Sequence, residues 1–286
     1  MNRMKWVSPV VFLITLGVLC IFAPLSALAF DAAADSVAGV PKPKVEPRAD
    51  ESKTNNMVEP VLLPLYHYKP IYFLAGNPYA KIQISFRTNL VESLPLFFGY
   101  TQLAMWDALV NHPAFYDLNY NPDVFYRFVT DRQRSQWLDL GAFEHESNGK
   151  GVDGEKSWNR VYVRYHDKTR VGNIMTMEWS LKAWWALNYN VSNQDLQRYR
   201  GIYEAEIMLS QIFPSFLDQG DVTLRIYPGG PSTVNPLRGG QELTFRTKVR
   251  WSPVLPLVMA QVFHGYGENL MDYKNDRWGI RGGFGF

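Results

Sequence analysis

Three residues in the middle of the chain have the types and the spacing of an acyl-transfer site. His145 and Ser147 are two residues apart, and Asn159 follows after a polar stretch. A histidine can accept the serine proton as general base, and an asparagine carbonyl can fix the imidazole tautomer without adding a charge. Gly149, two residues beyond the serine, could turn a backbone N–H toward the developing oxyanion. The alternative is a polar hairpin tip in which the histidine and the serine are incidental.

The elements that must position these groups are two strands joined by a loop at 150–156. Residues two apart on a strand share a face, so His145 and Ser147 project the same way. In the returning strand, Asn159 shares the face of Val161 and Val163. If His145 lies opposite Asn159, all three polar groups face the apolar side, where unpaired polar groups are costly. On the other face, Glu144 and Glu146 are predicted to form lumenal ion pairs with Arg160 and Arg164.

Period-two alternation continues through the chain from about residue 70 and predicts strands that are wet on one face and apolar on the other. In the segment 80–87, for example, apolar residues occupy the even positions and polar residues the odd ones. Alternation also suits a β-sandwich. Arg246 and Lys248 on the polar face in mid-strand, and the terminal Phe286 on an alternating strand, favour a barrel instead. The alternation gives ten or eleven strands, and twelve are expected because bacterial single-chain barrels close with even numbers. We therefore predict an all-β protein, a transmembrane antiparallel up-and-down β-barrel with twelve strands.

The first 29 residues have the features of a secretory signal peptide. Arg3 and Lys5 precede an apolar stretch, and 27–29 reads Ala-Leu-Ala, a small-x-small cleavage pattern. A retained membrane helix is the alternative, and Leu19 before Cys20 argues against a lipoprotein. Cleavage would remove the one cysteine, so no disulfide would stabilise the exported chain. Residues 30–66 are predicted to be a flexible lead-in and 67–286 the barrel domain.

Composition excludes several classes. The 286 residues include 29 basic and 27 acidic side chains, and without Arg3 and Lys5 the two signs balance. A neutral chain has no field to attract polyphosphate, so nucleic acid is not an expected partner. At 47% hydrophobic the chain is too apolar for disorder, and it has no apolar run of about 18 residues beyond position 30 to make a membrane helix. It has no P-loop, dinucleotide fingerprint or zinc spacing.

The stretches around the candidate triad, 145–150 (HESNGK) and 157–160 (SWNR), resemble outer membrane phospholipase A. Residues 100–102, 119–122 and 265–273 agree with it, and the similarity runs from about 65 to 286. The resemblance implies a twelve-stranded, calcium-dependent barrel that dimerises. It also implies His145 as base, Ser147 as nucleophile and Asn159 as orienter on the outer wall, and Gln102 at the dimer interface.

The resemblance also implies calcium ligands around the loop that follows the serine. It points to Lys150 through its carbonyl, to Glu155, and to Ser192 in the next outer loop. Asp153 lies close by and is a further candidate. The side chains of Lys150 and Glu155 depart from the arginine and serine usual in the family, although a glutamate is a good ligand for a hard cation. The alternative is that the loop acids are only solvated.

The expected function is therefore an outer-membrane hydrolase that cleaves acyl ester bonds of phospholipids. The resemblance implies phospholipase A1, A2 and lysophospholipase activity with calcium, activated by association into a homodimer in the bacterial outer membrane. The first alternative is a non-enzymatic barrel, porin-like or structural. The second is a secreted soluble esterase with a sandwich core.

Overall fold

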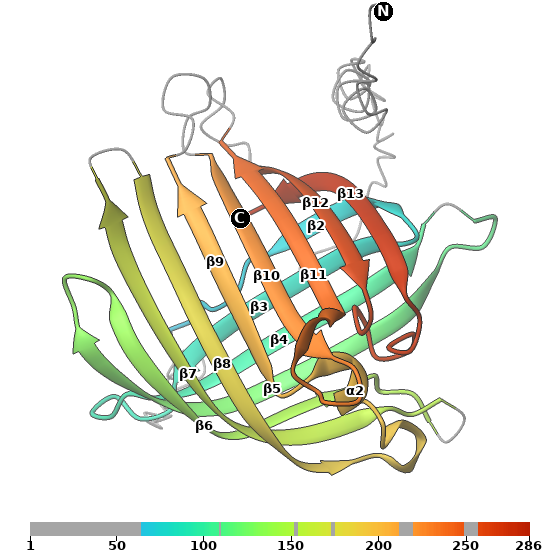
Figure 1. The fold of residues 1–286 in the computed structure, drawn as a ribbon, viewed down its shortest axis with the longest axis horizontal. Coiled ribbons are helices and arrows are strands. Elements are labelled where there is room, and N and C mark those ends of the chain that lie inside the picture. Colours follow the sequence, from blue (N-terminus) through green and yellow to red (C-terminus); the bar gives the residue numbers. More distant parts are fainter. Residues whose placement is uncertain (1–63, 109, 152–153, 173–174, 212–219, 249–256) are drawn as a thin grey trace, which may run out of the picture. The chain divides into compact units, whose positions relative to one another are not determined.

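A computed structural model describes residues 64–286 except 109, 152–153, 173–174, 212–219 and 249–256 (Figure 1). The predicted signal peptide and residues 30–63 of the predicted lead-in lie outside the described residues. Within the described part of the chain, neither helical segment has the length and the apolar character needed to cross a membrane.

Nearly every described segment is a strand, as the alternation predicts. The strands are β1 (Tyr66–His67), β2 (Tyr72–Asn77), β3 (Ala80–Asn89), β4 (Leu96–Asp107), β5 (Ala114–Asp131), β6 (Gln136–Ser147), β7 (Ser157–Val171), β8 (Met175–Tyr189), β9 (Tyr203–Ser210), β10 (Asp221–Gly229), β11 (Asn235–Thr247), β12 (Leu257–Gly265) and β13 (Arg277–Gly285). A short 3₁₀ helix η1 (Val191–Asn193) and the helix α2 (Gln197–Arg200) lie between β8 and β9.

Of the strands in the described ranges, the twelve from β2 to β13 form one closed antiparallel ring (Figure 1). Each pairs with the next along the chain, and β13 pairs with β2 to close the ring. The two-residue β1 adds to β3 beyond the end of its pairing with β2. The predicted twelve-stranded up-and-down barrel is confirmed, and the sandwich alternative is wrong, because one ring replaces two packed sheets.

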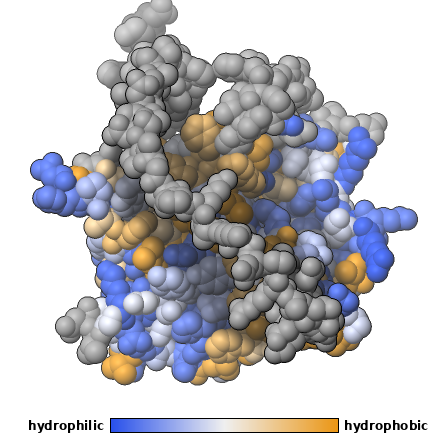
Figure 2. All heavy atoms as spheres, turned by 180° about the vertical axis from the view of Figure 1, so that it is seen from behind, coloured by the Kyte–Doolittle hydropathy of each residue, from blue (hydrophilic) through white to orange (hydrophobic). Residues whose placement is uncertain are grey.

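The outer face of the barrel carries a continuous apolar row. Strand register aligns Ile207, Leu224, Leu243, Val262 and Ile280 across five neighbouring strands. Four of these side chains are more than a third exposed, up to 61% for Ile280. Figure 2, which shows the molecule from behind relative to Figure 1, has patches of apolar residues on that side as well, with hydrophilic residues between them and at the margins. So much exposed apolar surface is expected of a wall that faces lipid.

The inner face is charged, and its charges pair across the lumen. Lys81 on β3 contacts Glu242 on β11 at 2.5 Å and Glu268 at 3.3 Å. Arg281 on β13 completes this group with a 2.6 Å ion pair to Glu268. A cavity of about 480 Å³ remains among the lumenal side chains. Pairing is what makes buried charges tolerable at such a position.

At the loop end, an aromatic and aliphatic cluster fills the barrel. Trp158 and Trp184 are buried and meet edge to face, with ring centroids 6.0 Å apart. Leu270 and Tyr273, from the segment between β12 and β13, pack into the same cluster, as does Leu196 before α2. The lumen is therefore occupied by side chains near this end, which disfavours an open porin-like channel.

Candidate active site

A bulge in β6 sets the direction in which His145 points. The register of β6 with β7 shifts between Gly141 and Glu144. Before the shift the even position Leu140 faces outward, at 40% exposure, whereas after it the odd position Phe143 does, at 46%. One inserted residue exchanges the two faces of a strand. Without the bulge, His145 would project into the lumen, and with it the imidazole lies on the outer wall.

His145 and Asn159 lie opposite each other on β6 and β7. The Asn148 N–H donates to the Lys156 carbonyl on the β7 side. His145 lies three residues earlier, so its own N–H and C=O point to the other side, toward β5. His145 and Asn159 are therefore a non-hydrogen-bonded pair, the type in which side chains approach most closely. His145 Nδ1 is 2.7 Å from Asn159 Oδ1. This contact selects the tautomer with the proton on Nδ1 and leaves Nε2 free to accept one.

Ser147 is the next outward residue on β6 after His145 and is half-buried. It stands opposite Ser157 on β7 and Tyr120 on β5. Gly149 follows with a φ of +62°, and a Cβ at this position would lie 2.7 Å from the Tyr120 ring. The loop can therefore leave the strand at Gly149 only because the residue is a glycine. His145 and Ser147 therefore lie at the end of β6, and Gly149 follows in the loop that leaves it.

Asn188 joins the site from β8, and sequence reasoning missed it. Asn159 Nδ2 donates to Asn188 Oδ1 at 2.6 Å. A register shift between β7 and β8 inserts Leu187, so that Asn188 rather than its neighbour stands opposite Asn159. The nearest signal in the sequence is that the polar Asn188 directly follows the apolar Leu187 at a point where the alternation of apolar and polar residues breaks down.

The loop after Ser147 is built around the buried Asn148. Its Oδ1 accepts from the backbone N–H of Lys156 at 2.9 Å and of Lys150 at 3.4 Å. Its Nδ2 donates to the Gly154 carbonyl at 2.9 Å. One side chain thus holds both ends of the loop that carries the predicted calcium ligands, which is a second role that sequence reasoning missed.

The predicted calcium ligands are brought together in part. Ser192 Oγ, in η1, donates to the backbone carbonyl of Glu155, so the hydroxyl and the loop are in direct contact. The Lys150 ammonium points elsewhere and donates to the Tyr116 carbonyl at 3.1 Å. Asp153 lies outside the described residues. A hydroxyl, a carbonyl and an exposed glutamate are oxygen donors of the kind that calcium takes, so the donor set fits this metal.

Among the described residues there is no group of three or more His, Cys, Asp or Glu side chains that could hold a metal.

Two further residues of the outer loops hold this region in place. Asn193, fully buried in η1, accepts from the Ser157 N–H and donates to the Ser157 carbonyl, both at 3.1 Å. Asp195 accepts hydrogen bonds from Tyr273 and Lys274. Burial alone would raise the pKa of Asp195, but these two hydrogen bonds and the Lys274 charge hold it below its usual range.

The lumenal charges behind the site follow the prediction in part. Glu144 lies 3.1 Å from Arg160, and Glu146 also contacts Arg160 at 3.1 Å. The predicted pairing of Arg164 with these glutamates is wrong, because Arg164 pairs with Asp139 at 2.7 Å. The bulge is the reason, since it leaves Asp139 directly opposite Arg164 in the register.

Gln102 faces outward. It pairs in register with Ile84, which is 50% exposed, whereas its neighbours Thr101 and Leu103 line the lumen. The alternative orientation, in which Gln102 would point into the lumen, is therefore excluded.

The fold and the site together define a class of protein, a closed β-barrel that carries a histidine–serine–asparagine constellation on its outer wall. The sequence profile of the phospholipase A1 family matches residues 69–286, and the chain belongs to this family.

Named relatives and solved structures agree with this assignment. Phospholipase A1 of Escherichia coli K12 is 29% identical over 182 residues, which cover 62% of this chain and 56% of that protein. Phospholipase A1 of Proteus vulgaris is 29% identical over 211 residues, 70% of this chain and 66% of that protein. The chain thus spans little more than half the length of the E. coli relative. A solved structure of outer membrane phospholipase A from E. coli superposes with a TM-score of 0.64 at 23% identity, covering 81% of this chain and 94% of that one. At this identity the likeness establishes the fold.

Proposed function

We propose that this protein is an outer-membrane hydrolase that cleaves acyl ester bonds of phospholipids. The observation that carries the proposal is the 2.7 Å contact between His145 Nδ1 and Asn159 Oδ1 on the same outward face as Ser147. Polar groups on an apolar wall cost free energy, so a functional role would account for the presence of three of them here. The wall also faces the place where phospholipid acyl chains lie. A cleaved signal peptide over 1–29 would deliver the chain to the bacterial outer membrane.

In the proposed reaction, Ser147 Oγ attacks the ester carbonyl while His145 Nε2 accepts its proton. Asn159, held by Asn188, keeps the imidazole in the tautomer that permits this transfer. His145 then returns the proton to the leaving alcohol, and an acyl-Ser147 intermediate remains. His145 activates a water molecule to release the fatty acid. A backbone N–H near Gly149 would bind the oxyanion.

Calcium is part of the proposal. The structural neighbour from Salmonella typhi, with a TM-score of 0.65 at 23% identity, is described as a dimer with bound calcium. In this chain Ser192 and Glu155 are in contact, and with Asp153 and the Lys150 carbonyl they would supply oxygen ligands. A bound calcium ion would add positive charge near the carbonyl under attack.

Association into a homodimer is also proposed. Gln102 lies on the outer wall beside the exposed Ile84, so a polar group is available to pair with a second barrel within an apolar surface. Two barrels side by side would enclose the acyl chains of the substrate between their walls. Activity would then depend on association.

The test is hydrolysis of a phospholipid by the detergent-solubilised protein, with and without a calcium chelator. Ser147→Ala and His145→Ala should each abolish hydrolysis, since groups that act as a unit lose nearly all activity singly. Both variants should remain folded barrels whose gel mobility shifts on heating. Full activity in either variant would contradict the proposal and favour the non-enzymatic alternative.

A further inference from the structure

The backbone carbonyl of His145 has no backbone N–H opposite it in the neighbouring strand β5. Tyr120 pairs with Ser147 and Asp123 with Glu144, so the register places Pro122 opposite His145. The N–H and C=O of His145 point toward β5, because those of Asn148, three residues later, point toward β7. A proline has no N–H and cannot donate to the ladder. The strand that carries the catalytic histidine is therefore missing a hydrogen bond at that residue.

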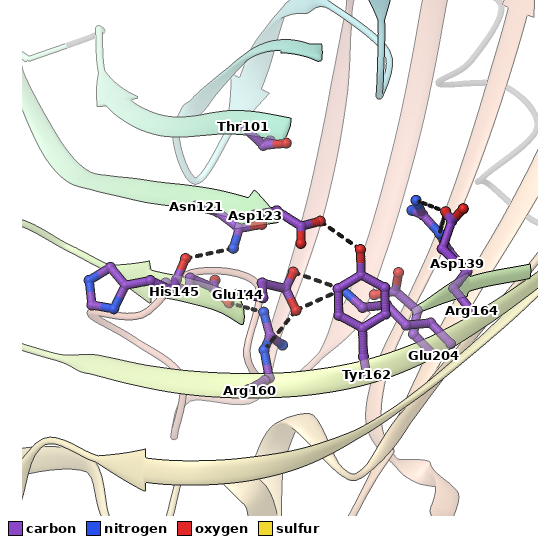
Figure 3. A network of polar contacts seen from close by, with 12 residues as sticks. Thr101, Asn121, Asp123, Asp139, Glu144, His145, Arg160, Tyr162, Arg164 and Glu204 are labelled. Atoms are coloured by element: carbon purple, nitrogen blue, oxygen red, sulfur yellow. Dashed lines mark hydrogen bonds and ion pairs between the residues drawn. The ribbon is translucent and has the colours of Figure 1, made fainter. Parts of the chain in front are cut away.

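The side chain of Asn121 supplies the missing donor. Its Nδ2 donates to the His145 carbonyl oxygen at 2.8 Å, from the lumenal side of the wall (Figure 3). Asn121 is 9% exposed, and its Oδ1 lies 3.5 Å from Lys69 Nζ. The amide is thus fixed at both ends, with its NH₂ group directed at the catalytic strand.

We propose that Asn121 is a positioning residue for His145: its amide replaces the N–H that Pro122 lacks and so holds the catalytic segment of β6 in register. The proposal rests on the proposed function. The segment concerned is short, because it lies between the bulge after Gly141 and the loop that begins at Asn148. A short strand segment between a bulge and a loop is held by few backbone hydrogen bonds. Each of these hydrogen bonds therefore affects the placement of the imidazole.

The first test compares two replacements of Asn121. Asn121→Ala removes the donor, and Asn121→Asp keeps the shape but replaces the NH₂ group by an acceptor. Each should lower kcat about tenfold with KM unchanged, since a small displacement of a catalytic group costs rate rather than binding. Thr101→Ala is the matched control, because Thr101 stands opposite Asn121 on β4 but bonds to Ser85, away from β6. The control should keep the parent rate.

The decisive variant is the pair Asn121→Ala with Pro122→Ala. The second change restores a backbone N–H opposite the His145 carbonyl, so kcat should return to within about twofold of the parent. A role of Asn121 in general barrel stability would not be rescued in this way. If the double variant is as slow as Asn121→Ala, or if Asn121→Asp retains the parent rate, the proposal is overturned.

A readout independent of hydrolysis is the ¹⁵N spectrum of protein labelled at histidine. In the parent, the His145 Nδ1–H should be protected by its bond to Asn159. Asn121→Ala should shift this signal or expose it to exchange, and the double variant should restore it. An unchanged signal in Asn121→Ala would refute the positioning role. Absence of hydrolysis by the parent protein would instead count against the proposed function, and the spectrum would still decide the role of Asn121.

Discussion

Asn188 Oδ1 accepts a 2.6 Å hydrogen bond from Asn159 Nδ2, and this contact decides which end of the Asn159 amide faces His145. An amide can present either its oxygen or its nitrogen to a neighbour. With its nitrogen held by Asn188, Asn159 must present its oxygen to His145 Nδ1. The proposed catalytic constellation thus extends over three strands, β6, β7 and β8.

Replacing Asn188 tests whether its hydrogen bond orients the Asn159 amide. Asn188→Ala should lower kcat about fivefold, the effect of losing about 1 kcal/mol of orienting hydrogen bond. Asn188→Asp keeps the acceptor and should stay near the parent rate. Steady-state hydrolysis of a phospholipid in detergent micelles measures both. An equal loss in the two variants would show that the acceptor is not what matters.

Removing the Glu155 carboxylate should weaken calcium binding. We expect Glu155→Ala to raise the calcium concentration for half-maximal activity about tenfold, because a charged oxygen ligand is lost. Glu155→Ser should have a smaller effect, since a hydroxyl remains, and the rate at saturating calcium should change little in either. Calcium titrations of activity, with Gln194→Ala in the exposed segment after η1 as control, measure the shift. The metal assignment fails if chelation leaves hydrolysis unaffected in the parent.

Asn148 should control the order of the loop that it closes. Asn148→Ala leaves the Gly154 carbonyl and the Lys156 N–H without their side-chain partner, so the loop should open more often. Limited proteolysis should cut the 149–156 region faster than in the parent. Asn148→Asp retains the acceptor for Lys156 and should be intermediate. Cleavage at the parent rate in Asn148→Ala would show that other contacts hold the loop.

Glu144 should stabilise the barrel and take no part in the chemistry. Its side chain is 1% exposed and pairs with Lys182 at 2.7 Å as well as with Arg160. Glu144→Ala leaves the buried Lys182 without its carboxylate and Arg160 with Glu146 alone, and should cost about 3–5 kcal/mol in the free energy of unfolding.

Glu178, which pairs with Lys168 at 2.5 Å at a more exposed position, is the matched control for Glu144. Glu178→Ala should cost at most about 1 kcal/mol. Urea unfolding in detergent measures both variants. A Glu144→Ala barrel that is as stable as the parent but inactive would identify Glu144 as a catalytic group.

The orientation of the barrel can be checked by labelling. The loop after β6 is expected to face the cell exterior, and the turn between β5 and β6 the periplasm. The mature chain should contain no cysteine, so Glu155→Cys and Gln133→Cys each introduce a single thiol. A membrane-impermeant reagent should label the first in intact cells and the second only after lysis. Equal labelling at both positions would contradict the orientation.

The sequence by itself determined the architecture, and it supplied the types of the groups that are proposed to be catalytic. Period-two alternation is a local property of each strand, so it can be read from one segment at a time, and together with the even strand number of bacterial barrels it predicted the twelve-stranded barrel. The spacing of His145 and Ser147 likewise follows from a single strand. The apolar parity of Asn159 was also available, because Val161 and Val163 lie within the same strand.

Only the tertiary structure decided how these groups are held. The bulges that turn His145 outward and bring Asn188 opposite Asn159 are relations between neighbouring strands, and strand alternation alone does not locate them. The contact of Ser192 with the Glu155 carbonyl and that of Asn121 with the His145 carbonyl join residues 37 and 24 positions apart. Such contacts depend on the register of whole strands, which is set by closure of the barrel and by packing in the lumen. Alternation within one strand assigns each residue to a face, but the turns and bulges between strands also set the register, and these are not visible in a single strand.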